Sequence, residues 1–146
     1  MSKDLREIGR IKIDDTKEFC IGENNALIVI SEYINSTSYK GFTAKTISLD
    51  KANLELFICE TKRVLSGELE ISIMSWGKDS KNDLIIQKIK KKEGDFQAQK
   101  YDLRQYVNSN VYNGYTKKGI RTTATPLKNL VNFLQRILKL KEDNCN

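Results

Sequence analysis

The chain lacks the side chains on which most hydrolytic chemistry depends. None of its 146 residues is histidine, which removes the commonest general base, the Ser/His and Cys/His nucleophile pairs and most mixed zinc sites. The three cysteines, Cys20, Cys59 and Cys145, are odd in number and show no CxxC spacing, which argues against a zinc knuckle or a disulfide framework. We expect Cys20 and Cys59 to be small core residues and Cys145 to be a thiol in the tail.

Carboxylate pairs offer the remaining route to catalysis. Asp14 with Asp15, and Asp79 with Asp83, could hold Mg²⁺, but acidic residues in turns are usually turn formers. The Gly-Lys-Asp-Ser run at 77–80 lacks the upstream glycine of a phosphate-binding loop. We therefore expect no enzymatic activity, no catalytic residues, no metal site and no cofactor.

The chain is instead rich in lysine and arginine, side chains that are suited to binding nucleic acid. Lys and Arg number 25 against 19 Asp and Glu, a net charge of +6. The charge is unevenly distributed: residues 1–73 hold 10 basic and 12 acidic side chains (net −2), whereas residues 74–146 hold 15 and 7 (net +8). Basic side chains neutralise phosphates, and tyrosine rings stack on unpaired bases. The second half is therefore the one expected to bind an acidic partner.

The two halves of the chain are copies of one unit. Residues 30–65 and 103–138 align without a gap at an offset of 73, and 11 of the 36 aligned positions are identical, Tyr33 with Tyr106 among them. Because repeats fold alike, we expect two tandem units of the same structure.

An amphipathic helix is predicted at the end of each copy. Core-facing residues recur at i, i+3, i+4, i+7, i+10 and i+11 from Leu54 and, in the same register, from Leu127. The predicted boundary residues are Asp50 as the N-cap of the first helix, Ser66-Gly67 as its end, and Thr125 followed by Pro126 as the start of the second.

The residues before each helix are typical of antiparallel strands, with a period of two and Gly, Asn and Ser between short β-branched and aromatic runs. Each copy is therefore three or four strands of a curved sheet followed by one helix. One such unit buries little core, so we expect an α+β body in which repeats 1–66 and 67–146 pair as an intramolecular pseudo-dimer. The predicted strands are 8–13, 17–22, 26–34, 42–49, 68–75, 84–91, 95–107 and 115–122, with Glu93-Gly94-Asp95 as a hairpin turn.

The outward faces of the strands differ between the copies. If Ile28 and Ile30 point inward, alternation turns Leu27, Val29, Ser31 and Tyr33 outward in the first copy, and Lys100, Asp102, Arg104 and Tyr106 outward in the second. We expect the first copy to be mainly scaffold, its apolar face covered by the second unit or by another chain. The candidate nucleic-acid-binding residues are Lys88, Lys90, Lys100, Arg104, Tyr106, Tyr112, Tyr115, Lys117, Lys118 and Arg121, with Lys45 from the first copy.

These segments resemble a known family. The run 101–106, Tyr-Asp-Leu-Arg-Gln-Tyr, then 116–120, Thr-Lys-Lys-Gly-Ile, and an amphipathic helix is similar to the single-stranded-DNA-binding domain of the transcriptional coactivator positive cofactor four. The first copy is similar through 27–33 and through 45–49, Lys-Thr-Ile-Ser-Leu. The resemblance implies paired curved sheets that bind single strands, in tandem as in Pur-alpha-type proteins and with the topology of Whirly proteins. It also implies that Arg104, Tyr106, Lys117, Lys118 and Lys45 face the nucleic acid, because they match family positions that do.

We therefore expect a binder of single-stranded DNA or RNA that acts in transcription regulation or nucleic-acid maintenance. The alternative is a protein-interaction module that uses a sheet edge or the apolar outer face of the first copy. Further possible partners are a second copy of the chain or the transcription machinery. With no apolar run long enough for a membrane span and no signal-peptide pattern, we expect an intracellular protein, cytoplasmic if bacterial and nuclear if eukaryotic.

Overall fold

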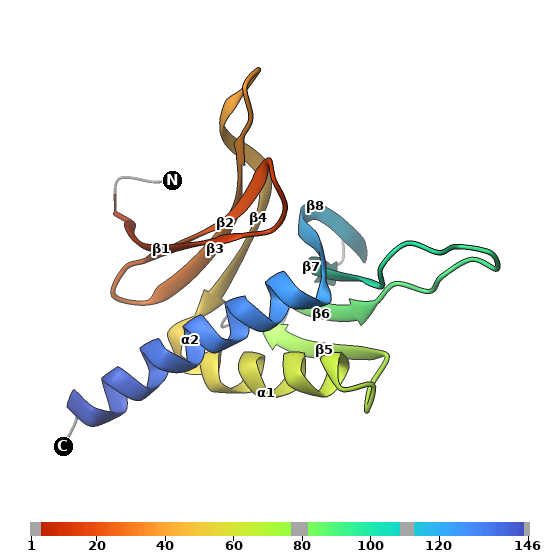
Figure 1. Cartoon of the computed structure of the whole chain (residues 1–146). Coiled ribbons are helices and arrows are strands. Elements are labelled where there is room, and N and C mark those ends of the chain that lie inside the picture. The colour runs from red at the N-terminus through yellow and green to blue at the C-terminus, as the bar shows by residue number, and fades with distance from the viewer. Residues whose placement is uncertain (1–3, 77–81, 109–112, 145–146) are drawn as a thin grey trace.

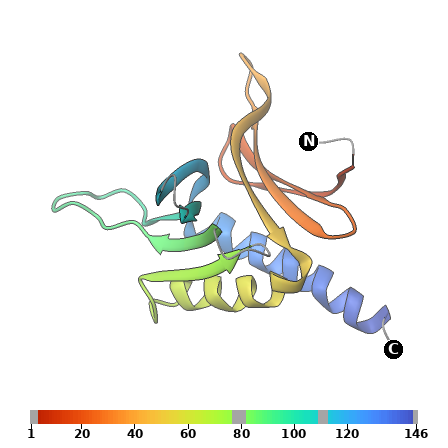
Figure 2. The same cartoon turned by 180° about the vertical axis from the view of Figure 1, so that it is seen from behind.

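A computed structural model of the chain describes residues 4–76, 82–108 and 113–144. It contains two antiparallel four-stranded sheets, each followed in the chain by one α-helix (Figure 1). The α+β class expected from the sequence is confirmed, with four strands in each unit. Both sheets lie on one side of the helices, and the two helices run beneath them (Figures 1 and 2).

The first sheet has the strand order β1-β2-β3-β4, so every strand pairs with its neighbour in the chain. A short 3₁₀ turn at Lys51–Asn53 joins this sheet to helix α1 at Leu54–Leu65. The four strands are β1 (Arg6–Lys12), β2 (Lys17–Glu23), β3 (Leu27–Asn35) and β4 (Lys40–Asp50).

The second sheet repeats this order as β5-β6-β7-β8 and leads into helix α2 at Ala124–Asn144. The hairpin between β6 and β7 projects away from the body (Figure 1). The four strands are β5 (Ile71–Trp76), β6 (Asn82–Lys88), β7 (Lys100–Asn108) and β8 (Asn113–Thr123).

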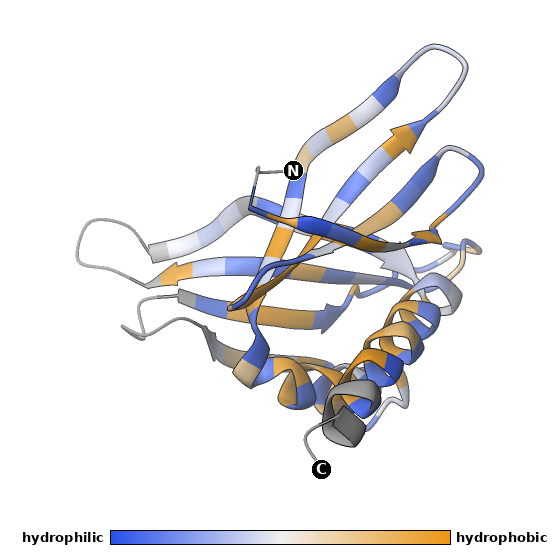
Figure 3. Ribbon diagram, turned by 90° about the vertical axis from the view of Figure 1, so that its left-hand side faces the viewer, coloured by the Kyte–Doolittle hydropathy of each residue, from blue (hydrophilic) through white to orange (hydrophobic). Residues whose placement is uncertain are grey.

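One hydrophobic core unites the two units. Helix α1 packs against α2, and β4 packs against β8, so side chains from both sheets and both helices share a single buried cluster. Apolar and polar residues alternate along the strands (Figure 3). Ile28 and Ile30 on β3, and Leu103 on β7, are fully buried, which confirms the inward face assigned from alternation.

Both sheets carry the same β-bulge. On the first sheet Ser31 pairs with Thr46 and Tyr33 with Phe42, so one residue of β3 lies opposite three residues of β4. Arg104 pairs with Gly119 and Tyr106 with Tyr115 on the second sheet, which leaves one residue opposite three again.

A threonine side chain stabilises each bulge in the same way. Thr43 Oγ1 accepts a hydrogen bond from the amide of Lys45 at 3.1 Å, and Thr116 Oγ1 accepts one from the amide of Lys118 at 3.1 Å. Bulges bend a strand and change the direction of its side chains. Lys45 and Lys118 therefore occupy corresponding positions at the same irregularity of the two sheets.

Both helices start at different residues from those expected from the sequence. Asp50 is not the N-cap of α1, because β4 continues to this residue, where it pairs with Leu27, and the 3₁₀ turn follows. Helix α2 begins at Ala124, so Thr125 lies inside it rather than before it. The predicted end of α1 is confirmed: Ser66 is its C-cap and Gly67 has a φ of +86°.

Strand β7 is shorter than predicted. It begins at Lys100 rather than at residue 95. The side chain of Gln99 and the amide of Ile89 cross-link the two arms of the hairpin beside Lys100, and the bond from the Asp95 amide to the Lys92 carbonyl closes the turn. The predicted turn around Gly94 is confirmed, with φ at +82°. Residues 90–98 between β6 and β7 are exposed, and they form the projecting hairpin.

Candidate nucleic-acid interface

The outer face of β7 and β8 carries a pair of tyrosine rings. Tyr106 and Tyr115 are cross-strand partners, with ring centroids 5.3 Å apart and planes at 89°. This edge-to-face arrangement fixes both rings, because each limits the rotation of the other. Tyr115 is 48% exposed, so its ring is accessible to a partner on this face.

Two arginines next to the tyrosines are held by one buried carboxylate. Arg104 donates from Nε to Asp102 Oδ2 at 3.0 Å and from Nη2 to Oδ1 at 3.1 Å, a bidentate pair. Nε of Arg121 lies 3.7 Å from Asp102 Oδ1 on the neighbouring strand. The Asp102 side chain is only 2% exposed, whereas that of Arg121 is 56% exposed. The cluster therefore keeps a net positive charge that faces solvent.

The guanidinium of Arg104 is held in place by a third contact. Its Nη1 donates to the carbonyl oxygen of Thr116 at 2.9 Å. Contacts to described residues thus use three of its five N–H groups, which leaves two for a partner. Gly119 makes room for this arrangement, since a Cβ there would lie 2.8 Å from Cζ of Arg104. The cluster is preorganised before any ligand arrives.

The residues predicted to share the outward face of the second copy do lie on it, but Asp102 is buried there rather than exposed. Asp102 lies on this face, yet the two arginine side chains cover it. One signal of this was visible in the sequence, because an acid two residues before Arg104 on a strand shares its face. The contribution of Arg121 depended on the register of β8, which the sequence pattern did not supply.

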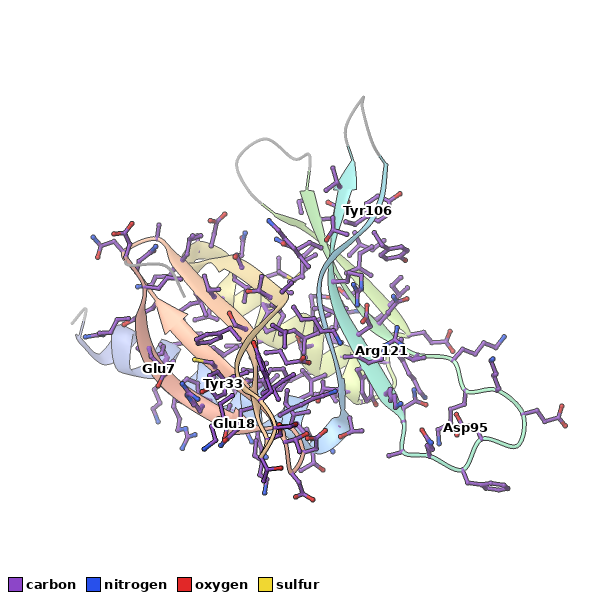
Figure 4. All side chains as sticks on the ribbon, turned by 90° about the horizontal axis from the view of Figure 1, so that it is seen from above. Glu7, Glu18, Tyr33, Asp95, Tyr106 and Arg121 are labelled. Carbon is purple, nitrogen blue, oxygen red and sulfur yellow. The ribbon has the colours of Figure 1, made fainter. Side chains whose placement is uncertain are left out.

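The remaining predicted cations are distributed over β7 and β8, the first sheet and the projecting hairpin. Lys100 and Lys118 are exposed on β7 and β8, and Lys45 is exposed on β4 of the first sheet. Lys88 and Lys90 are exposed at the base of the projecting hairpin. Arg121 and Tyr106 lie on the second sheet, and Asp95 marks the hairpin tip (Figure 4). Tyr112 lies outside the described residues, and so does the side chain of Lys117.

The equivalent face of the first sheet has the same aromatic pair but a different charge. Tyr33 and Phe42 pack edge to face, with centroids 5.1 Å apart. The guanidinium of Arg10 covers the Tyr33 ring at 4.2 Å. Arg10 is itself paired with Glu7 at 2.9 Å and with Glu18 at 3.4 Å, so its charge is neutralised.

The predicted apolar character of that first face is only partly observed. Leu27 and Val29 are half-buried within the sheet and present no large exposed apolar surface. Exposed apolar side chains lie elsewhere, and three of them are on the second unit: Ile71 and Ile73 on the edge strand β5 are 44% and 63% exposed, and Phe96 on the hairpin is almost fully exposed. The sequence analysis assigned no role to these three residues.

The cysteines divide differently from the prediction. Cys20 is buried, and its thiol donates to Glu7 Oε1 at 3.0 Å. Burial and this hydrogen bond raise the pKa of Cys20 to about 12. Cys59 is exposed, because it lies on the solvent side of α1, away from the stripe that contacts the core. Cys145 lies outside the described residues.

Carboxylates do not form a metal site in the described part of the chain, where no group of three or more Cys, Asp or Glu could hold an ion. Asp14 is a turn former, and its Oδ1 accepts hydrogen bonds from the amides of Thr16 and Lys17. Desolvation raises the pKa of Asp14, but the hydrogen bonds from these two amides and from the Thr16 hydroxyl outweigh it, so the pKa is lowered. Asp79 and the run 77–80 lie outside the described residues.

A pocket of about 320 Å³ lies between the two sheets. Glu32 and Lys45 line it from the first sheet, and Lys100 and Arg121 line it from the second. Glu32 is only 3% exposed, on the inward side of β3 at the bulge. No sequence pattern marked Glu32 as a site residue, because alternation alone does not show which inward positions lie beside the other sheet.

Comparisons with known proteins identify the fold. No protein-family model matches the chain, and no curated protein sequence matches it. A solved structure of a guide-RNA-binding protein complex bound to a guide RNA is similar over 97% of this chain and 94% of that chain, with a TM-score of 0.50 and 9% identity. The MRP1/MRP2 proteins of Trypanosoma brucei are similar over 94% of this chain and 93% of that chain, with a TM-score of 0.43 and 16% identity. At 9% identity the first likeness shows a shared fold. Among the described helices, none has the length and apolar character required to cross a bilayer.

Proposed function

We propose that the protein binds single-stranded RNA or DNA on the outer face of β7 and β8, without catalysing a reaction. The observation that carries the proposal is the arrangement of the Tyr106–Tyr115 ring pair beside two arginines fixed by Asp102. Phosphates pair with the remaining guanidinium N–H groups, and an unpaired base stacks on the accessible ring. A duplex hides its base faces, so a single strand fits this surface better.

The fold supports the proposal through one comparison. The chain shares its fold with a protein of the guide-RNA-binding complex, and it does so over nearly the full length of both chains. Fold alone does not assign function, so the chemistry of this face remains the main support. The same fold is compatible with the resemblance to the coactivator, Pur-alpha and Whirly proteins and with a role in transcription or nucleic-acid maintenance.

We also propose that the repeats 1–66 and 67–146 act as an intramolecular pseudo-dimer. Equivalent elements of the two halves contact each other, α1 with α2 and β4 with β8. The equivalent bulges and ring pairs are the further support. In this arrangement the first half is the scaffold, since Glu7 and Glu18 neutralise Arg10 on its outer face.

The test is a fluorescence anisotropy titration of a labelled single strand across a salt series. Seven predicted cations have described side chains, and each phosphate contact contributes a slope of about −0.7 to log K against log salt, or about −5 in all if every cation is engaged. Affinity should then fall about a thousand-fold between about 50 and about 200 mM salt. The seven cations are Lys45, Lys88, Lys90, Lys100, Arg104, Lys118 and Arg121.

A matched pair of double variants localises the contact. Lys118→Gln with Arg121→Gln should make the slope shallower by about 1.4, which is two contacts at about 0.7 each. Lys62→Gln with Lys128→Gln removes the same charge from exposed positions on the helices and should leave the slope unchanged. Absence of binding to any single strand at low salt, or tighter binding to duplex, would contradict the proposal.

A second candidate function rests on the edge strand β5. Ile71 and Ile73 are exposed on this strand, and it has no neighbour on its outer side in the described sheet. An extended segment of a partner protein could add to such an edge and cover both isoleucines. Association of this kind would depend weakly on salt, so the same titration separates it from phosphate-driven binding.

A further inference from the structure

The pocket between the two sheets contains a buried carboxylate that has no partner in the described part of the chain. Glu32 is 3% exposed and lines the pocket, and among the described residues no hydrogen bond or ion pair reaches its carboxylate. Asp14, the other acid of the pocket, is already satisfied by the amides of its own turn. A buried carboxylate that lacks partners is costly, so the pocket suits a ligand that donates hydrogen bonds to Glu32.

The rest of the pocket has the opposite charge. Lys17, Lys45, Lys100 and Arg121 contribute four cations against the two carboxylates. They come from both sheets, so the site exists only where the two sheets meet. An anion with an attached group of N–H donors satisfies the lysines and Glu32 together, and a nucleotide has both parts.

The size of the pocket suits a small ligand, such as one nucleoside. Its volume of about 320 Å³ is at the lower end of the range of about 300–1,000 Å³ for small-molecule sites. Lys100 and Arg121 line the pocket and also belong to the basic face of β7 and β8. A strand bound on that face can therefore place one of its nucleotides in the pocket.

The base that fits the Glu32 carboxylate is guanine. Its Watson–Crick edge presents two adjacent donors, N1–H and the N2 amino group, which match the two oxygens of a carboxylate. Adenine and cytosine place a ring-nitrogen acceptor beside their amino group, and uracil places its one N–H between two carbonyl oxygens. Each of these three bases therefore brings an acceptor against the carboxylate.

We propose that the pocket between the sheets selects one guanine of a bound single strand through Glu32. This inference rests on the proposed nucleic-acid binding and adds base specificity to it. Stacking and phosphate contacts tolerate any base, so without Glu32 the protein would bind all sequences alike. Glu32 is thus a specificity-determining residue, while the arginines and tyrosines supply the general affinity.

The experiment compares short oligouridylates that carry one guanosine, inosine, cytidine or adenosine at the centre with an all-uridine strand. Wild-type protein should bind the guanosine strand roughly five- to a hundred-fold more tightly than the all-uridine strand, the range for a bidentate contact to a base. Inosine retains N1–H but lacks the N2 amino group, so its strand should bind with intermediate affinity.

Two glutamate variants assign the preference to the pocket. Glu32→Gln keeps the side-chain shape and should bind the guanosine and all-uridine strands with nearly equal affinity. Glu55→Gln removes the same charge from an exposed position on α1 and should keep the wild-type preference. The inosine comparison on the wild-type protein tests the same contact without any variant.

The outcomes separate the two proposals. Equal binding of all strands by the wild-type protein would overturn the inference and leave the proposed function intact. A preference for cytidine or adenosine, or a guanosine preference that survives in Glu32→Gln, would also overturn it. Failure of every strand to bind at low salt would instead overturn the proposed function itself.

Discussion

Replacement of Asp102 by asparagine tests whether the arginines are held in place or merely attracted. The side chain of Asp102 is 2% exposed and makes two charge-assisted hydrogen bonds to Arg104, at 3.0 and 3.1 Å. Loss of one member of a buried pair costs about 3–5 kcal/mol. The Arg104 side chain is 22% exposed and can regain part of its hydration, so we expect Asp102→Asn to lower the free energy of unfolding by about 2–3 kcal/mol.

The assay is urea denaturation, with Asp15→Asn as the control. Asp15 carries the same charge on a fully exposed side chain and pairs with Lys12 at 3.5 Å. This variant should leave the unfolding midpoint unchanged, because exposed ion pairs contribute little. Equal stability of the two variants would refute the reasoning.

Binding gives a second readout with an informative sign. Asp102→Asn makes the β7–β8 face more positive, so a surface that acts by charge alone would bind a single strand more tightly. We expect weaker binding, because Arg104 and Arg121 lose the carboxylate that orients them. Tighter binding would show that orientation contributes nothing.

Two further predictions concern packing and reactivity. Gly9→Ala should lower the free energy of unfolding, measured in urea, by about 1–3 kcal/mol. A Cβ at this position would overlap the ring of Phe133 and displace α2 from β1. Unchanged stability would contradict this packing. Cys20 should resist alkylation at pH 8 while Cys59 reacts, because the raised pKa of Cys20, about 12, keeps its thiol protonated until the pH approaches that value. Peptide mass spectrometry of the labelled protein measures both reactions. Labelling of native Cys20 at pH 8 would refute its burial.

The helices and strands were largely predictable because their signals are local. The 3.6-residue period from Leu54 placed α1 correctly, and Gly67 marked its end. Helix starts were less accurate, since β4 extends to Asp50 through pairing with Leu27 and leaves that side chain no capping role. A strand partner distant in sequence thus overrode a local capping preference.

The contents of the candidate site were only partly predictable. Strand alternation identified Arg104, Tyr106 and Tyr115 as members of one outer face, and the register places the two rings 5.3 Å apart. That Asp102 is buried beneath two arginines follows from the side chains of two strands together, which no single-strand pattern shows.

The amino-acid sequence by itself determined the repeated order of strands and helices and the unequal charge of the two halves, because periodicity and composition are properties of neighbouring residues. Only the tertiary structure decided which charges meet. Glu32 has no side-chain partner among the described residues, yet it shares a pocket with Lys100 and Arg121, because β4 packs against the second sheet. Such juxtapositions depend on how the two sheets pack, and packing joins residues that are far apart in the chain.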